Sequence, residues 1–277
     1  MKTHWMTTAA ALATALLLSA CGGGRDADHT ITVAANPVPH GEVLEQTRPI
    51  LKAQGYELDI KVVNDYIVPN TALANDDVDA NFFQHEPYMN TVIHVEHKGD
   101  PKYDFVKAGG YLLAPIGIYS KHYKRLQDLP DGAKVLMRNA VADEGRVLAI
   151  FQREGLIKLN PNVPIVSASV ADIIDNPKHL DFRPNIEASM LPAMYRNDEG
   201  DAIVINANFA LGAGLDPVHD PIAVEASNNN PYINIVAVRR GHEHDPKVEA
   251  LLGALRDPKV QQFVIDKYKG AIIPVND

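Results

Sequence analysis

Cysteine is almost absent from this chain of 277 residues, since Cys21 is the only one. A single cysteine excludes an intramolecular disulfide. Membrane-spanning runs are also missing, because the one long apolar stretch, residues 9–18, is shorter than the ~20 residues that a bilayer of ~30 Å requires. The sequence has no block of like charges and a net charge of −9, so nucleic acid is not an expected partner.

The apolar stretch near the N-terminus is typical of a secretory signal peptide, which we expect over residues 1–20. The residues Leu18-Ser19-Ala20 before Cys21 form a lipobox, so Cys21 is the expected lipidation site and mature N-terminus. Residues 21–29, which include three glycines, are the expected flexible tether. A free cysteine buried in a helix is the competing interpretation. The prediction is a bacterial envelope lipoprotein that is held at the membrane by its acyl chains and faces the periplasm.

Catalytic motifs are missing. The chain contains no Gly-x-Ser-x-Gly elbow and no glycine loop of the kind that cradles phosphate. Asp76, Asp77 and Asp79 bring carboxylates together, but they lie in a polar stretch that is typical of a solvated surface. We therefore expect neither an enzyme nor a cofactor.

Three histidines, His85, His94 and His97, raise the alternative of a metal site. His94 and His97 have the spacing of one helix face, but His85 lies nine residues earlier and is separated from them by Pro87. Histidines at a helix end also interact favourably with the helix dipole. The solvated helix end is the favoured interpretation, and no metal site is predicted.

Strands and helices alternate along the remainder of the chain. Residues 30–35 have the pattern of a strand, and a helix with apolar residues between 43 and 51 follows and stops at Gly55. A second strand comes directly after it, which predicts a parallel sheet covered by helices. Two Asp-Pro-Lys sequences, at 245–247 and 257–259, are typical of helix starts.

The predicted fold class is α/β, with two lobes and two crossings between them. Gly109-Gly110 and Pro115 break a long β-rich segment, where we place the first crossing. The expected boundaries are 30–113 for the first part of lobe 1, 114–228 for lobe 2 and 229–277 for the return to lobe 1. Such a layout places a ligand in the cleft between the lobes, where hinge closure encloses it.

Several polar or aromatic residues lie at junctions between these elements. They are Tyr66, Phe83, His85, Arg146, Asn206 and Asn234. We expect Arg146 in the first turn of a helix that begins near Asp143, and we expect residues 79–81 to turn the chain towards the cleft. A zwitterionic ligand needs these residue types: arginine and amides for its carboxylate, and aromatic walls for an apolar side chain. A surface ion pair for Arg146 and a turn role for Asn206 are open alternatives.

The segment "NDYIVPNTALANDDVDANFFQHEPYMN" at 64–90 resembles the NlpA family of methionine-binding lipoproteins. Four shorter segments support the resemblance, which extends from Thr30 to Asn276. They are "GRVLAIFQREGLIKL", "DIIDNPKHL", "AIVINANFA" and "NPYINIVAVR". The resemblance implies a type II periplasmic-binding-protein fold and the role of substrate-binding component of a methionine ABC transporter, with a permease and ATPase complex as partner.

By matched position, the resemblance also implies roles for the candidate residues. Tyr66, Phe83 and His85 would line the side-chain end of an amino-acid ligand. Arg146 would bind the ligand carboxylate, and Asn206 and Asn234 would bind its zwitterionic groups. We expect capture of the ligand by hinge closure, without bond chemistry.

The chain departs from the family pattern just before Arg146. The pattern P-N-D-P-T-N-x-G-R becomes "RNAVADEGR", so that Ala142-Asp143 replaces Thr-Asn and Glu144 adds a second acid. We expect these acids to compete with a ligand carboxylate or to engage the ligand ammonium. The ligand alternatives are another amino acid, a short peptide or a metal ion. A non-transport surface lipoprotein is the alternative function.

Overall fold

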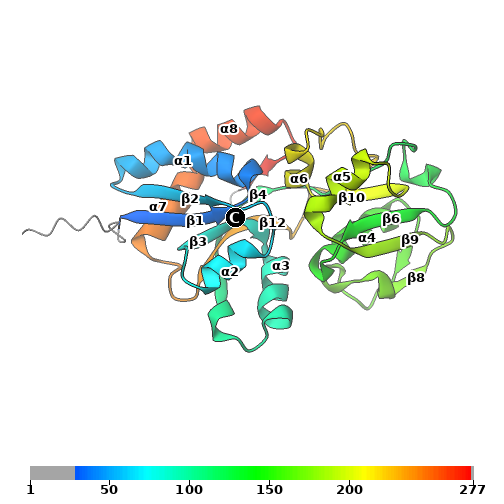
Figure 1. The fold of residues 1–277 in the computed structure, drawn as a ribbon, viewed down its shortest axis with the longest axis horizontal. Helices are drawn as coiled ribbons and strands as arrows, with labels where there is room; N and C mark the ends of the chain where they lie inside the picture. Colours follow the sequence, from blue (N-terminus) through cyan, green and yellow to red (C-terminus); the bar gives the residue numbers. More distant parts are fainter. Residues whose placement is uncertain (1–28, 276–277) are drawn as a thin grey trace, which may run out of the picture.

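The computed structural model describes residues 29–275. The expected signal peptide, the lipidation site Cys21 and most of the tether lie outside these residues. The described chain forms two α/β lobes placed side by side (Figure 1), so the predicted fold class is confirmed. Between residues 29 and 275, no helix combines the length and apolarity that a membrane crossing requires.

The first lobe is built on a six-stranded sheet with the order β13-β4-β12-β3-β1-β2. Its strands are β1 (Thr30–Ala35), β2 (Glu57–Val62), β3 (Ala80–His85), β4 (Phe105–Leu113), β12 (Ile233–Arg239) and β13 (Ile273–Pro274). β1 pairs in parallel with β2 and β3, as predicted, whereas β12 runs antiparallel to β3 and β4. The sheet therefore joins strands from both ends of the sequence.

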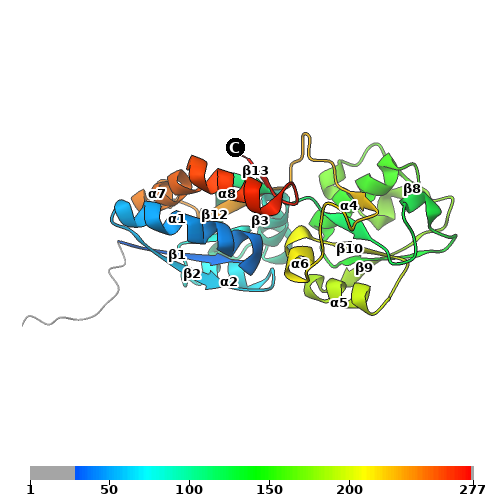
Figure 2. The same cartoon turned by 90° about the horizontal axis from the view of Figure 1, so that it is seen from above.

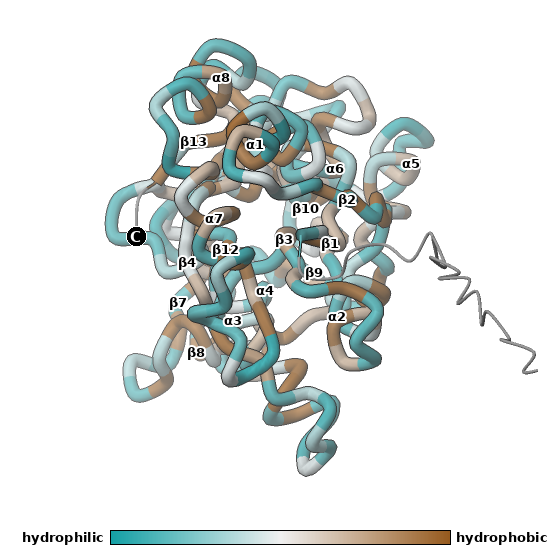
Figure 3. The backbone as a smooth tube through the Cα atoms, turned by 90° about the vertical axis from the view of Figure 1, so that its left-hand side faces the viewer, coloured by the Kyte–Doolittle hydropathy of each residue, from teal (hydrophilic) through white to brown (hydrophobic). Residues whose placement is uncertain are grey.

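Helices cover both faces of this sheet. On one face α1 (Glu42–Ala53), α7 (Pro246–Leu255) and α8 (Pro258–Tyr268) pack against one another, and α2 (Val68–Ala74) and α3 (Glu86–Thr91) lie on the other (Figure 3). Strands that are covered on both faces have few solvent-facing positions. All six residues of β3 are accordingly buried.

The predicted stop of α1 and the predicted starts of α7 and α8 are confirmed. α1 buries Val43, Leu44 and Leu51, and the chain leaves it through Gly55, whose φ of +87° suits glycine. Asp245 and Asp257 are the N-cap residues of α7 and α8, each followed by proline in the first turn. Proline is tolerated there because the first helical N–H groups have no partner within the helix.

The second lobe contains a five-stranded sheet with the order β11-β5-β10-β6-β9. Its strands are β5 (Gly117–Tyr119), β6 (Lys134–Arg138), β9 (Asp181–Ile186), β10 (Ala202–Ile205) and β11 (Ala223–Val224), and a small separate sheet consists of β7 (Lys158–Leu159) and β8 (Ile173–Asp175). Its helices are α4 (Val141–Arg153), α5 (Leu191–Arg196) and α6 (Ala207–Gly212). Side chains alternate along β6, so that Val135 packs in the core beneath α4 while Leu136 packs on the opposite side with residues of α5.

Short turns of 3-10 or π geometry connect several of these elements. They are Pro37–Gly41, Val92–Glu96, Pro101–Tyr103, Leu126–Asp128, Ile165–Ser167, Val170–Asp172 and Ala188–Met190. The chain passes between the sheets twice, between β4 and β5 and between β11 and β12, and Figure 2 shows the lobes separated along the long axis. The boundaries at 113/114 and 228/229 stay predictions.

Two local expectations were wrong. Residues 79–81 do not form a turn, because Ala80 already begins β3 and pairs with both β1 and β12. Helix α4 begins at Val141, two residues before the expected start, so Arg146 lies in its second turn and not its first. Polar side chains misled the first expectation, since Asp79 and Asn81 bond within the protein: the Asp79 carboxylate accepts from the Thr32 N–H at 2.7 Å.

Candidate functional site

One cavity between the two lobes is lined by all six candidate residues. Its lining consists of Tyr66, Phe83, Gln84, His85, Tyr88, Ala114, Arg138, Arg146, Asn206, Ala207, Asn208 and Asn234. The empty space among these side chains, including the part that opens to solvent, is about 370 Å³. The part of this space that the centre of a water molecule can occupy is about 30 Å³, so the lining side chains lie close together. The cavity thus brings together residues that are up to 168 positions apart, from Tyr66 to Asn234.

The first lobe contributes an aromatic wall. Phe83 faces the cavity while the preceding Phe82 packs into the core under α1 on the other side of the sheet, as strand alternation requires. The Tyr66 ring lies 6.0 Å from the Phe83 ring and 5.1 Å from that of Phe209 in the second lobe. Its hydroxyl donates to Asn208 Oδ1 at 2.6 Å, which links the lobes directly. The aromatic wall therefore spans the cleft.

His85 ends β3 and is held by hydrogen bonds on both ring nitrogens. Nδ1 accepts the backbone N–H of Tyr88 at 3.1 Å, so the proton must lie on Nε2, which donates to Asp143 Oδ1 at 2.8 Å. Burial lowers the pKa of His85 even though the bond to Asp143 opposes that shift. His85 is therefore a neutral donor that joins the first lobe to the second.

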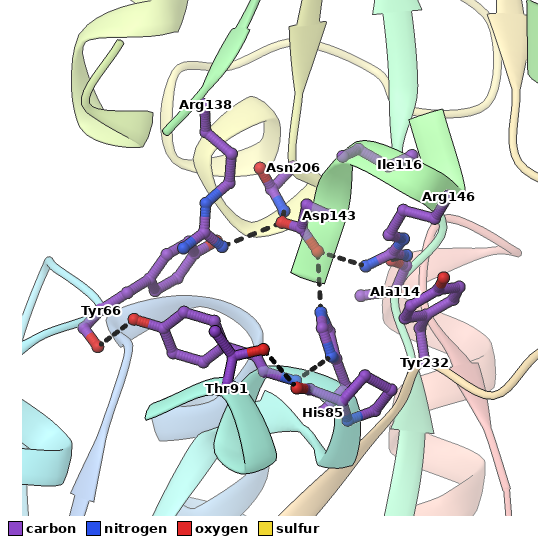
Figure 4. A network of polar contacts seen from close by, with 12 residues as sticks. Tyr66, His85, Thr91, Ala114, Ile116, Arg138, Asp143, Arg146, Asn206 and Tyr232 are labelled. Carbon is purple, nitrogen blue, oxygen red and sulfur yellow. Dashed lines mark hydrogen bonds and ion pairs between the residues drawn. The ribbon is translucent and has the colours of Figure 1, made fainter. Parts of the chain in front are cut away.

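Asp143 lies at the centre of the polar contacts in the cleft (Figure 4). Its side chain is fully buried, and its second oxygen, Oδ2, accepts from Arg138 Nη1 at 2.9 Å and from Asn206 Nδ2 at 3.3 Å. Burial by itself would raise the pKa of Asp143, but the charges of Arg138 and Arg146 and the His85 bond hold it well below its usual range. Asp143 is thus an ionised carboxylate inside the cleft.

Arg138, at the end of β6, was not among the predicted site residues. Its guanidinium carbon lies 4.5 Å from the centre of the Tyr66 ring and 4.9 Å from that of Tyr88. A cation held over two rings is stabilised by their electron-rich faces. Its pairing with Asp143 leaves Nε without a hydrogen-bond partner among residues 29–275. Arg138 therefore adds a positive charge to the aromatic wall.

Arg146 is engaged by acidic side chains. Its Nε donates to Glu225 Oε1 at 2.9 Å, its Nη2 donates to Glu225 Oε2, and its Nη1 lies 3.6 Å from Asp143 Oδ1. The guanidinium also lies over the Tyr232 ring, 4.4 Å from its centre. Burial opposes the charged form, but Glu225 and Asp143 outweigh it and raise the pKa of Arg146. The simple surface ion pair considered above is wrong, because this pair is almost completely buried.

The two asparagines reach the cavity in different ways. Asn206 is the N-cap residue of α6; its Nδ2 donates to Asp143, while its Oδ1 is buried and finds no donor within the described part of the chain. Asn234 is fixed by His40, whose Nε2 donates to Asn234 Oδ1 at 2.8 Å. Burial lowers the pKa of His40 to about 4 despite this bond, so its ring is neutral. Of the two amides, Asn234 already accepts a hydrogen bond through Oδ1, whereas Asn206 Oδ1 is an acceptor beside the cavity without a partner among residues 29–275.

Glu144 does not belong to this site. Its Oε2 accepts the backbone N–H of Val170 at 3.0 Å, within the second lobe. The expectation that both acids face the ligand is therefore wrong for Glu144. For Asp143 it stays a prediction, because Asp143 bonds to residues that line the cavity but does not line it itself. No group of three or more metal-binding side chains that could hold an ion occurs within residues 29–275.

Sequence analysis missed Arg138, Asn208 and Glu225. For Arg138 a signal was present, because strand alternation places it on the face of Leu136, towards the aromatic wall. Glu225 carried no local signal: it meets Arg146 only through a contact between residues 79 positions apart.

The pattern of the NlpA lipoprotein family matches residues 31–276. The chain belongs to the NlpA lipoprotein family. Among relatives, it is 44% identical over 264 residues to the methionine-binding lipoprotein MetQ of Bacillus subtilis, covering 94% of each chain. It is 32% identical over 265 residues to the D-methionine-binding lipoprotein MetQ of Escherichia coli K12, covering 95% of this chain and 94% of that one.

Solved structures of NlpA-family relatives superimpose closely. A putative methionine-binding lipoprotein from Bacillus subtilis has a TM-score of 0.87 at 45% identity, with 91% of this chain and 100% of that chain covered. A nutrient-binding protein from Burkholderia cenocepacia, bound to methionine, has a TM-score of 0.80 at 37% identity, with 88% and 99% covered. The family resemblance seen in the sequence is therefore confirmed.

Proposed function

We propose that this chain is a lipid-anchored solute-binding protein that captures methionine in the cleft between its lobes and delivers it to an ABC transporter. The observation that carries the proposal is the convergence of all six candidate residues, from both lobes, on one cavity. Relatives named as methionine-binding lipoproteins, one of them solved with methionine, support the choice of ligand.

The cavity offers complementary groups to an amino acid. Phe83 and Tyr66 are apolar surfaces for the thioether side chain. Asn206 Oδ1 is an acceptor for the ligand ammonium, which satisfies a buried group that otherwise costs about 1–3 kcal/mol. Arg146 and the amide of Asn234, oriented by His40, lie where they can receive the carboxyl end. The ligand is therefore bound by contacts from both lobes.

Binding by both lobes implies closure as the mechanism. His85 with Asp143 and Tyr66 with Asn208 are hydrogen bonds across the cleft, so they form only when the lobes approach. A ligand in the cavity contacts both lobes when they are close together, and it therefore stabilises the closed form. The closed form is the one that the permease and ATPase complex would accept.

The anchor is proposed on Cys21, which follows the lipobox residues 18–20. Stable membrane attachment needs more than one acyl chain, because a single chain binds a bilayer only weakly and reversibly. Metabolic labelling with radioactive palmitate should mark the wild-type protein in the membrane fraction and leave Cys21→Ser unlabelled. Equal labelling of the two proteins would contradict the assigned anchor.

The ligand is tested by isothermal titration calorimetry of the full chain, purified in detergent and stripped of bound solute by unfolding and refolding. L- and D-methionine should bind, and glycine should not. Asn206→Ala should weaken methionine binding at least about tenfold, the scale of one hydrogen bond to a charged group. Asn197→Ala, in an exposed turn, is the matched control. Absence of methionine binding by the wild type would overturn the proposed function.

A further inference from the structure

One protein carboxylate fills the point where the donors of the cleft converge. Three donors hydrogen-bond to Asp143, namely His85 Nε2 at 2.8 Å, Arg138 Nη1 at 2.9 Å and Asn206 Nδ2 at 3.3 Å, and the ion-paired Arg146 Nη1 lies 3.6 Å away. His85 and Arg146 face Oδ1, whereas Arg138 and Asn206 face Oδ2. Oδ2 therefore accepts two hydrogen bonds, and Oδ1 accepts one with the Arg146 cation beside it. The side chain is fully buried and does not line the cavity, so it offers little access to a ligand ammonium.

The charges of the cleft are already balanced. Arg138 and Arg146 contribute two positive charges, and Asp143 and Glu225 contribute two negative ones, 2 − 2 = 0. All four side chains are almost completely buried, so solvent screens them weakly. A ligand carboxylate at this point would be a third anion facing two cations. The ligand carboxylate is therefore stabilised less by electrostatic attraction there than it would be beside two arginines that have no acidic partner within the protein.

We propose that Asp143 is a specificity-determining residue, which occupies the position of a ligand carboxylate between Arg138 and Arg146. The cleft then binds a ligand with a free carboxylate little more tightly than one with an uncharged carboxyl end. It therefore accepts methionine derivatives such as the amide or a peptide-linked residue. This inference rests on the proposed function. The geometry favours it over direct binding of the ligand ammonium by Asp143, since Asp143 is fully buried and does not line the cavity.

The chain offers a conservative variant and a matched control for the test. Asp143→Asn removes the charge and keeps the shape of the side chain. Glu144→Gln removes the charge of the neighbouring acid, which is buried but bonds to Val170 outside the cleft. Titration calorimetry gives the Kd of L-methionine and of L-methioninamide for each full-length protein, at about pH 6.5, where both α-amino groups are protonated.

The decisive quantity is the ratio of the two Kd values, because a change in general affinity cancels in it. We expect Asp143→Asn to shift this ratio towards methionine by about tenfold or more, and Glu144→Gln to leave it at the wild-type value. A smaller shift, an opposite shift or an equal shift in the control would overturn the role of Asp143. Thermal unfolding followed by circular dichroism checks that each variant is folded.

Two further outcomes are informative. If Asp143→Asn does not fold, Asp143→Ser removes the same charge, and the wild type by itself remains a test. It should bind the two compounds with Kd values within about tenfold of each other, and a stronger preference for methionine would overturn the inference. Binding of neither compound by the wild type would overturn the proposed function. Binding of methionine with an unchanged ratio would overturn only the role of Asp143.

Discussion

The buried pair of Arg146 and Glu225 makes a quantitative prediction. The side chains are 3% and 7% exposed, and Arg146 Nε donates to Glu225 Oε1 at 2.9 Å. Arg146→Met keeps an unbranched apolar side chain but removes the guanidinium that lies over Tyr232, and it leaves the Glu225 charge buried without its partner. Removal of one member of such a pair costs about 3–5 kcal/mol of the free energy of unfolding.

The double variant separates the charge from the packing. In Arg146→Met with Glu225→Gln no charge remains unpaired, and the Gln oxygen can still accept the Ile116 N–H that Glu225 accepts at 3.2 Å. We therefore expect the double variant to regain at least about 2 kcal/mol relative to Arg146→Met. The half-exposed pair of Arg183 with Asp181 is the control, and Arg183→Met should cost less than about 1 kcal/mol.

Urea unfolding followed by circular dichroism measures all these differences, provided that the slope of free energy against urea is unchanged. A loss below about 1 kcal/mol for Arg146→Met would refute the reasoning, because the pair would then be worth no more than a surface contact. A double variant that is no more stable than the single one would also refute it, since the cost would then come from lost packing.

Two further predictions concern stability. The pKa of His40 is about 4 when folded and 6.5 when unfolded, so the unfolded state binds more protons between these values, and stability should fall by about 2–3 kcal/mol from pH 7 to pH 4.5. His40→Gln should flatten this dependence in urea titrations, and an unchanged slope would contradict the assignment. A Cβ on Gly145 would lie 1.7 Å from the Ile165 carbonyl oxygen, so Gly145→Ala should cost about 2 kcal/mol or more. Gly212→Ala, with nothing within 4 Å of the added atom, should be neutral or stabilising, and equal losses in the two variants would argue against the clash.

Local patterns predicted the elements well wherever apolar spacing and helix limits agreed. The strand at 30–35, α1 with its stop at Gly55 and the Asp-Pro starts of α7 and α8 are examples. They depend on forces within a few residues: alternation, caps and backbone conformation. The expectation for residues 79–81 failed because long-range pairing with β1 and β12 outweighs the local preference of polar residues for turns.

The candidate site shows the same division. The residue types of Tyr66, Phe83, His85, Arg146, Asn206 and Asn234, together with their family positions, were sufficient to predict one shared cavity, and all six line it. The acid at 143 was visible as a departure from the family pattern, but the partners that it would meet were not. Whether these residues bind the ligand stays a prediction for the proposed experiments.

By itself, the sequence determined the family, the α/β class and the residue types available for binding, because these depend on composition, spacing and matched motifs. Only the tertiary structure decided how the charges are paired. Arg138, at the end of β6, hydrogen-bonds to Asp143 in the first turn of α4. Arg146 hydrogen-bonds to Glu225, which lies 79 positions later in the sequence, and His85 hydrogen-bonds to Asp143 from the other lobe. Coulomb and hydrogen-bond energies depend on distance and burial, and the folding of two lobes around one cleft sets both.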